Sequence, residues 1–146
     1  MQYPHVEDCR LVALARKTDP RGNLSVVEAL RDVPFEIRRV SYLYDVPTGE
    51  SRGAHAHHAL HQFLICLSGS FDVELDDGTQ TRRVHLNRPW LGLHIPPMIW
   101  AAEQNFDPGS VCLCLASELY RADDYIRDRD AFEALRNAGL GAGAAR

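Results

Sequence analysis

The sequence predicts an all-β domain, a sandwich or barrel of antiparallel strands that ends in one helix. Short runs rich in Val, Ile, Leu, Tyr and Phe recur from residue 10 to residue 117, turn signals separate them, and only the C-terminal stretch has a helical pattern. A chain of 146 residues fits one domain with its own core. We expect that domain to span residues 1–138, followed by a flexible tail at 139–146.

Nine apolar runs are the predicted strands, and segments rich in Gly, Pro, Asp and Asn lie between most of them. The runs cover residues 10–15, 24–30, 38–46, 53–59, 61–69, 70–77, 81–86, 90–96 and 110–117. The clearest hairpin is 70–86, because Phe71, Val73 and Leu75 alternate with acidic residues and Asp77-Gly78 tolerates the positive φ of a tight turn.

The helix is expected near the C-terminus, in ADDYIRDRDAFEALRNAGLG. The acidic pair 123–124 suits a helix start and Gly139 suits its end. The apolar stripe that indicates the helix consists of Tyr125, Ile126, Phe132 and Leu135.

Composition excludes several function classes. With 16 basic against 20 acidic residues, a net charge of -4 and no long basic run, the chain does not have the electrostatics of a nucleic-acid-binding protein. No apolar segment has the length of a signal peptide core or a membrane span, which favours a cytoplasmic protein without a membrane partner. The four cysteines lack metal-site spacing, so we expect buried, reduced thiols.

The segment RGAHAHHALHQ places four histidines within residues 52–62. Alternation along a strand would put His55, His57 and, if the strand continues without a bulge, His61 on one face and His58 on the other. Such a set could hold a metal, and the H-x-H-x3-H spacing resembles the first metal motif of cupins, although the proline-rich segment 96–104 supplies no further histidine. It could instead carry protons between adjacent carbons, or be a polar, half-exposed strand.

Most of the chain resembles the cupin-fold TDP-4-keto-6-deoxyhexose 3,4-ketoisomerases. The resemblance is carried, in the order of that family, by DPRGNLSVVE (19–28), VPFEIRRVSYLYDV (33–46), RGAHAHHALHQFLICLSGSFDVELDDG (52–78), LGLHIPPMIW (91–100) and LASELYRADDYIRDRDAF (115–132).

The resemblance implies a double-stranded β-helix, or jelly roll, in a homodimer that exchanges N-terminal strands. It also implies that the carbonyl of a TDP-linked 4-keto-6-deoxy sugar moves from C-4 to C-3 through an enediol, without metal or other cofactor. The product would be a precursor of 3-amino-3,6-dideoxysugars for lipopolysaccharide or another surface polysaccharide. His55 and His57 of the HAH motif would be the catalytic pair, with His55 as the main base and His57 as its partner.

Cations are expected to bind the diphosphate, since guanidinium groups match phosphate oxygens. Arg21, which is followed by Gly22, and Arg52 match family positions, and Arg39 is a third candidate. For the thymine and sugar, an apolar wall could come from Tyr42, Tyr44 or Trp100.

Some positions depart from the family pattern. Ser41 stands where the family has a tyrosine near the active site, Ala101 where it has a histidine, and His58 where it has a lysine. His61 replaces a common acidic residue and would be a further substrate-side group. Two alternatives therefore stay open: a metal-dependent cupin that uses His55, His57 and His61, and a sugar-nucleotide binding module without turnover.

Overall fold

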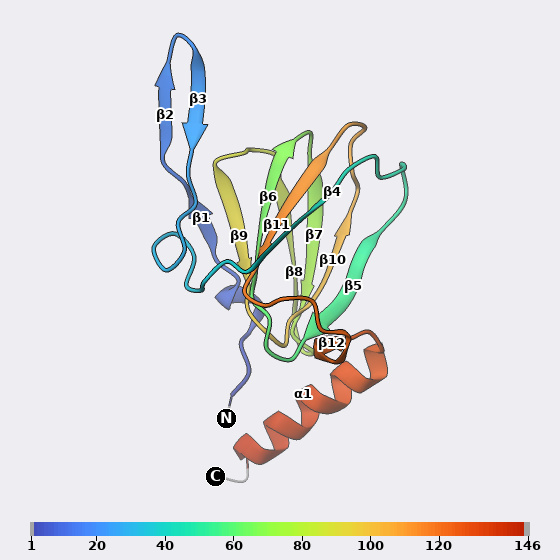
Figure 1. The fold of residues 1–146 in the computed structure, drawn as a ribbon. Helices are drawn as coiled ribbons and strands as arrows, with labels where there is room; N and C mark the ends of the chain where they lie inside the picture. The colour runs from blue at the N-terminus through green and yellow to red at the C-terminus, as the bar shows by residue number, and fades with distance from the viewer. Residues whose placement is uncertain (1, 145–146) are drawn as a thin grey trace.

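The computed structural model describes residues 2–144, with side chains through residue 139, and shows two five-stranded antiparallel sheets facing each other (Figure 1). One sheet has the order β1-β9-β6-β11-β4 and the other the order β12-β5-β10-β7-β8, while β2 and β3 form a separate hairpin. Antiparallel neighbours in both sheets and, within residues 2–144, a single α-helix near the C-terminal end confirm the predicted all-β class with a C-terminal helix.

The strands are short, from two to seven residues each. Those of the first half are β1 (Leu11–Ala13), β2 (Arg16–Asp19), β3 (Gly22–Ser25), β4 (Arg39–Leu43), β5 (Arg52–His57) and β6 (Gln62–Ser68). Those of the second half are β7 (Phe71–Asp76), β8 (Thr81–Leu86), β9 (Leu91–Ile95), β10 (Trp100–Gln104), β11 (Val111–Ala116) and β12 (Tyr125–Ile126). The helical segments are η1 (Val6–Asp8), η2 (Ala122–Asp124) and α1 (Arg129–Ala144), and none of them is both long enough and apolar enough to cross a membrane.

The core fills the space between the two sheets. On β7, Phe71, Val73 and Leu75 are fully buried while the acidic residues between them are less so. This period of two lets one face of the strand remove its apolar surface from water, which is the main stabilising contribution in such a sandwich. The predicted hairpin at 70–86 is thereby confirmed as β7 and β8, paired from Phe71↔Leu86 to Asp76↔Thr81.

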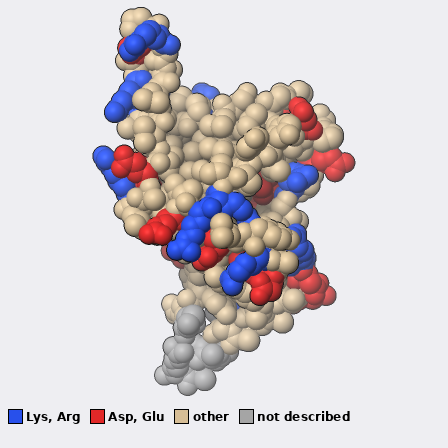
Figure 2. Space-filling view, viewed as in Figure 1, with Lys and Arg blue, Asp and Glu red and all other residues tan. Residues whose placement is uncertain are grey.

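The β2–β3 hairpin extends away from the body of the molecule (Figure 1). All of its strand residues are exposed, its turn carries Arg21, and Gly22 is the first residue of β3. Beside the hairpin lies an apolar groove of about 610 Å³, and Figure 2 shows an expanse with few charges over this part of the sheet. The groove is lined mainly by Leu14, Leu24, Val27, Ile37, Val40, Ile65, Trp90, Leu113 and Leu115.

The C-terminal helix differs from the prediction at both ends. It begins at Arg129 rather than at the acidic pair 123–124, because Tyr125 and Ile126 pair with β5 and the Asp128 carboxylate accepts the Ala131 N–H in the first turn.

The helix also continues past Gly139 to Ala144. A Cβ at position 139 would lie 2.6 Å from the Tyr3 ring, so this glycine permits close packing and does not end the helix. Residues 139–144 of the expected tail are therefore helical, and 145–146 lie outside the described residues.

Candidate active site

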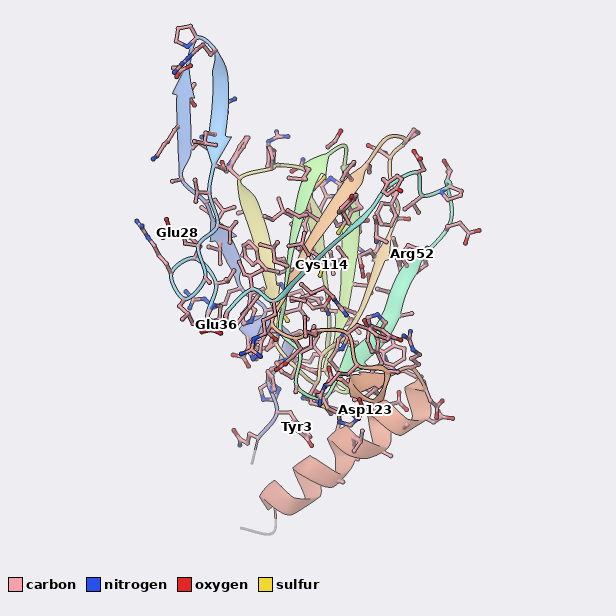
Figure 3. The ribbon with its side chains drawn as sticks, viewed as in Figure 1. Tyr3, Glu28, Glu36, Arg52, Cys114 and Asp123 are labelled. Atoms are coloured by element: carbon pink, nitrogen blue, oxygen red, sulfur yellow. The ribbon has the colours of Figure 1, made fainter. Side chains whose placement is uncertain are left out.

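A cavity of about 350 Å³ lies between the two sheets. Figure 3 labels one residue on each side of it, Arg52 on β5 and Cys114 on β11. Its walls come from β4, β5, β6, β10, β11 and β12, and consist of Arg39, Ser41, Tyr42, Leu43, Arg52, Gly53, His55, His57, Gln62, Glu103, Cys112, Cys114 and Tyr125. Five of the predicted site residues meet here: Arg39, Ser41, Arg52, His55 and His57.

The histidine pair is placed by a distortion of β5. Gly53 and Ala54 have positive φ values of 83° and 56°, and the register between β5 and β10 shifts between Ala101 and Ala102. Such bulges redirect the side chains that follow them. The rings of His55 and His57 consequently meet edge to face in the cavity, with centroids 4.9 Å apart.

His57 is fixed by a buried carboxylate. Its Nδ1–H donates to Oδ2 of Asp124 over 3.1 Å, and both side chains are only 3 % exposed. The other carboxylate oxygen of Asp124 accepts the Ala59 N–H at 2.8 Å. Burial lowers the pKa of His57 although Asp124 acts in the opposite direction. With Nδ1 engaged, Nε2 is the nitrogen that remains available for chemistry.

His55 is the less constrained of the two imidazoles. Among the described residues, nothing hydrogen-bonds to its buried Nδ1. Burial, together with the charges of His57 and Arg127, lowers the pKa of His55 to about 4. At neutral pH His55 is therefore a neutral imidazole, and one of its two ring nitrogens carries the lone pair that a general base requires.

Tyr125 completes the aromatic side of the site, and it was missed as a site residue because its sequence context fits a helix. Its ring centroid lies 5.0 Å from that of His55 and 4.4 Å from that of His57. Its hydroxyl oxygen accepts a hydrogen bond from Nη2 of Arg39 at 3.1 Å, which leaves the phenolic proton free to donate. The two-residue strand β12 places it there by pairing Tyr125 with His57.

Glu103 on β10 was also missed, because an isolated acidic residue in WAAEQ carries no motif. Its carboxyl lines the same cavity. Burial raises its pKa to about 7, with Arg52 acting in the opposite direction. A carboxyl with this pKa is present in both protonation states near neutral pH.

His61 does not share the face of His55 and His57, which corrects the expectation from strand alternation. β5 ends at His57, and the chain turns before β6 begins at Gln62. His61 instead stacks on His94, with Nδ1 and Nε2 3.0 Å apart, and packs beside Phe35.

The metal-dependent alternative required His61 to join the other two histidines, and the fold separates them. No group of three or more His, Cys, Asp or Glu side chains arranged to hold a metal ion occurs within the part of the chain that the structure describes.

Three other predicted binding residues lie outside the cavity of their own chain. Arg21 and Gly22 are at the turn of the projecting hairpin, where the Arg21 guanidinium pairs with Asp19 at 2.8 Å. Trp100 packs against Phe132 of α1 with centroids 5.5 Å apart, so it belongs to the packing between helix and sheet and is not a wall of the site. Of the aromatic candidates, Tyr42 does line the cavity, whereas Tyr44 lies beside it with a ring centroid 5.8 Å from that of Tyr42.

The sequence matches one family model, described as "FdtA: WxcM-like, C-terminal", over residues 7–137. The chain belongs to the FdtA family.

Relatives of known name agree with this assignment. A TDP-4-oxo-6-deoxy-alpha-D-glucose-3,4-oxoisomerase of Aneurinibacillus thermoaerophilus is 39% identical over 124 residues, which cover 85% of this chain and 89% of that protein. A mutant of the 3,4-ketoisomerase QdtA from Thermoanaerobacterium thermosaccharolyticum, solved in complex with TDP-4-keto-6-deoxyglucose, superposes with a TM-score of 0.89 at 36% identity, covering 92% of this chain and 97% of that one. The TDP-quinovose 3,4-ketoisomerase WlaRB of Campylobacter jejuni gives a TM-score of 0.85 at 43% identity, covering 88% and 99%.

These similarities confirm two predictions made from the sequence. The resemblance to the sugar-nucleotide 3,4-ketoisomerases is confirmed by the family match and the curated relative. The cupin-like all-β fold is confirmed by the superposition on solved ketoisomerases.

Proposed function

We propose that this protein is a 3,4-ketoisomerase of a TDP-linked 4-keto-6-deoxyhexose that works by histidine acid–base catalysis without a metal. One observation carries the proposal: His55, a neutral imidazole with an unpartnered buried nitrogen, lies in the cavity beside a His57 that Asp124 holds in place. The names of the relatives, which are TDP-sugar 3,4-ketoisomerases, supply the substrate class.

The chemistry begins at the carbon beside the ketone. A proton on C-3 is acidified by the C-4 carbonyl, and its removal places negative charge on the carbonyl oxygen O-4. His55 takes this proton and returns it to C-4, while His57 positions the base. The Tyr125 hydroxyl, polarised by the Arg39 guanidinium, donates to the oxygen on which charge develops.

Substrate binding relies on cations at the wall of the cavity. Arg39 and Arg52 both line it. A guanidinium group suits a diphosphate oxygen. The exposed ring of Tyr42 supplies an apolar surface at the same wall for the thymine or the sugar.

The proposal includes a homodimer that exchanges the β2–β3 hairpin. A projecting two-stranded hairpin is marginally stable by itself, and the apolar groove beside it remains uncovered in one chain. Exchange would cover the groove and bring Arg21 and Gly22 against a second subunit, where they could serve as the predicted ligand contacts. Light scattering at several protein concentrations tests this directly, since a monomer at all concentrations would contradict it.

We also place the enzyme in the cytoplasm, in a route to 3-amino-3,6-dideoxysugars of lipopolysaccharide or another surface polysaccharide. The four free thiols suit a reducing compartment. A 3-keto sugar is the type of compound that an aminotransferase converts into a 3-amino sugar.

The test is isomerisation of TDP-4-keto-6-deoxyglucose, with and without a chelator, followed by proton NMR. We expect a 3-keto product that is unaffected by the chelator and absent with a His55→Asn variant. A folded wild-type protein that is stabilised by TDP but gives no product would instead favour a sugar-nucleotide binding module. Loss of turnover upon chelation would favour metal-assisted chemistry.

A further inference from the structure

Glu103 lies beside the catalytic histidines on the neighbouring strand. In the register of β10 and β5, Ala101 is opposite His55 and Glu103 is opposite Arg52. Ala101 and Glu103 share the inward face of β10 because they are two residues apart. The Glu103 carboxyl consequently lines the same cavity as His55 and His57.

The backbone of β5 is shaped to admit this carboxyl. A Cβ at position 53 would lie 2.6 Å from Oε2 of Glu103 and 3.2 Å from the Ala101 carbonyl oxygen. Gly53 therefore leaves the space that the carboxylate oxygen occupies, and its φ of +83° is one that a residue with a side chain rarely adopts. The distortion that aims the histidines thus also seats Glu103.

The proposed reaction requires two different proton movements. One proton travels between carbons, from C-3 to C-4, and a second travels between oxygens, from the hydroxyl O-3 to the former carbonyl O-4. A single base occupied by the carbon-bound proton cannot hold the oxygen-bound proton at the same time. The cavity must therefore contain another group that both gives and accepts a proton.

The other groups in the cavity fit this task less well. Arginine is always protonated in proteins, and a serine hydroxyl does not readily give up its proton. Burial raises the pKa of the Cys114 thiol to about 12 and that of the Cys112 thiol further, so neither ionises near neutral pH. In the proposed function His57, held through Nδ1 by Asp124, positions the base, and the Tyr125 hydroxyl, which accepts from Arg39, stabilises the charge on O-4 through a hydrogen bond and keeps its proton.

We infer that Glu103 is a third acid–base residue of the site, which carries the oxygen-bound proton while His55 carries the carbon-bound one. The inference deepens the proposed function and rests on it.

The steps balance without any further reactant. His55 removes the C-3 proton, the C–H electron pair becomes the C-3=C-4 double bond, and the carbonyl pair moves to O-4, which takes the proton of the Glu103 carboxyl. The Glu103 carboxylate then removes the O-3 proton. As the C-3 carbonyl forms, the double-bond pair takes the proton from His55 at C-4. Both residues return to their starting states.

The groups that face Glu103 set its titration. Arg52 and His55 face it from β5, Cys112 and Cys114 from β11, and Val73 is its partner on β7. Arg39 lines the same cavity from β4. Of these groups Arg52 lowers the pKa of Glu103, but burial outweighs it and keeps that pKa at about 7. Both steps assigned to Glu103 are then accessible at neutral pH.

The test compares Glu103→Gln and Glu103→Asp with wild type and with a Glu74→Gln control. Glu74 is a suitable control because it lies on the adjacent strand β7, opposite Ala102, and pairs with Arg83 away from the cavity. Two rates are measured by NMR in deuterated buffer from pH 5.5 to 9: formation of the 3-keto sugar, and replacement of the C-3 proton by deuterium.

We expect E103Q to lower isomerisation by about 10²-fold and to slow C-3 exchange less than isomerisation, because the base His55 and the Tyr125 hydroxyl that stabilises O-4 are both intact. The decline in wild-type kcat above pH about 7, where Glu103 loses its proton, should be absent from E103Q. E103D should recover part of the activity, and its kcat should decline with rising pH at a different pH from that of the wild type. E74Q should behave as wild type.

Other results overturn the inference. If E103Q isomerises as fast as E74Q, Glu103 transfers no proton. The same conclusion follows if the E103Q substitution lowers the rates of C-3 exchange and isomerisation equally and leaves the pH profile unchanged. If E103Q does not fold, E103D with an unchanged pH profile overturns it as well. Wild-type protein that gives no product contradicts the proposed function itself. Active wild-type protein together with an E103Q variant that isomerises as fast as E74Q contradicts only the role of Glu103.

Discussion

Replacement of Glu103 by Gln should make the stability of the protein less sensitive to alkaline pH. The folded state raises the pKa of this carboxyl from 4.5 to about 7, chiefly through burial. A raised pKa means that the folded state favours the protonated form. The stability that depends on the proton is therefore lost as the pH rises from 4.5 through about 7. Gln has nearly the same shape and stays neutral, so it removes this dependence.

The magnitude follows from the size of the shift. One pKa unit corresponds to about 1.4 kcal/mol, so the complete loss amounts to roughly 3 kcal/mol, of which about 2 kcal/mol falls between pH 5.5 and 8.5. Urea unfolding of the wild type and of E103Q at these two pH values, at one protein concentration, measures this change in the free energy of unfolding. The free energy of unfolding of E103Q relative to wild type should increase by about 2 kcal/mol at the higher pH. An equal difference at both pH values would refute the argument that Glu103 titrates inside the cavity.

Three further predictions follow from the site and the core. Asp124→Asn should lower kcat by about 10²-fold or more with little change in KM, because the amide can hold His57 in the wrong tautomer; steady-state kinetics with unchanged turnover would contradict this. Gly92→Ala should lower the free energy of unfolding by about 1–3 kcal/mol, since the new Cβ would lie 2.0 Å from the Phe63 ring; a urea midpoint equal to that of wild type would be inconsistent with this packing. Turnover should fall as the pH decreases through about 4, where His55 gains a proton and stops acting as a base; a pH–rate profile with no such decline would assign the base to another group.

Much of the fold could be predicted because local patterns agree with it. The alternation in 70–86 and the Asp77-Gly78 turn predict β7 and β8, and the structure adds only that the buried Asp77 carboxylate accepts the N–H groups of Thr79 and Gln80. The C-terminal segment was harder to predict, because tertiary contacts override its helical pattern. Tyr125 pairs with His57 of β5, and the carboxylate of the preceding Asp124 accepts a hydrogen bond from the ring of His57. The helix therefore starts at Arg129 and not at the acidic pair 123–124.

In the site, too, the sequence predicts the residues that a local motif marks, but not the residues that tertiary contacts bring together. The HAH motif identifies His55 and His57 because their spacing is local, and family resemblance adds Arg39, Arg52 and Ser41. His61 was misplaced because the end of β5 at His57 depends on contacts made elsewhere, including the hydrogen bond from the Met98 N–H to the His57 carbonyl.

Tyr125, Asp124 and Glu103 reach the site from segments 45 residues or more away in sequence from the HAH motif. Their spacing carries no signal, because only the folded topology brings β10 and β12 alongside β5.

The measurement that tests the central claim most directly is the NMR time course of TDP-4-keto-6-deoxyglucose with the metal-free wild-type protein and with His55→Asn. Our account predicts that the wild type converts the 4-keto sugar into its 3-keto isomer after treatment with a chelator, and that the folded variant does not. A variant that isomerises at the wild-type rate, or a wild type that loses its activity together with a metal, would contradict the assignment of a metal-free histidine isomerase.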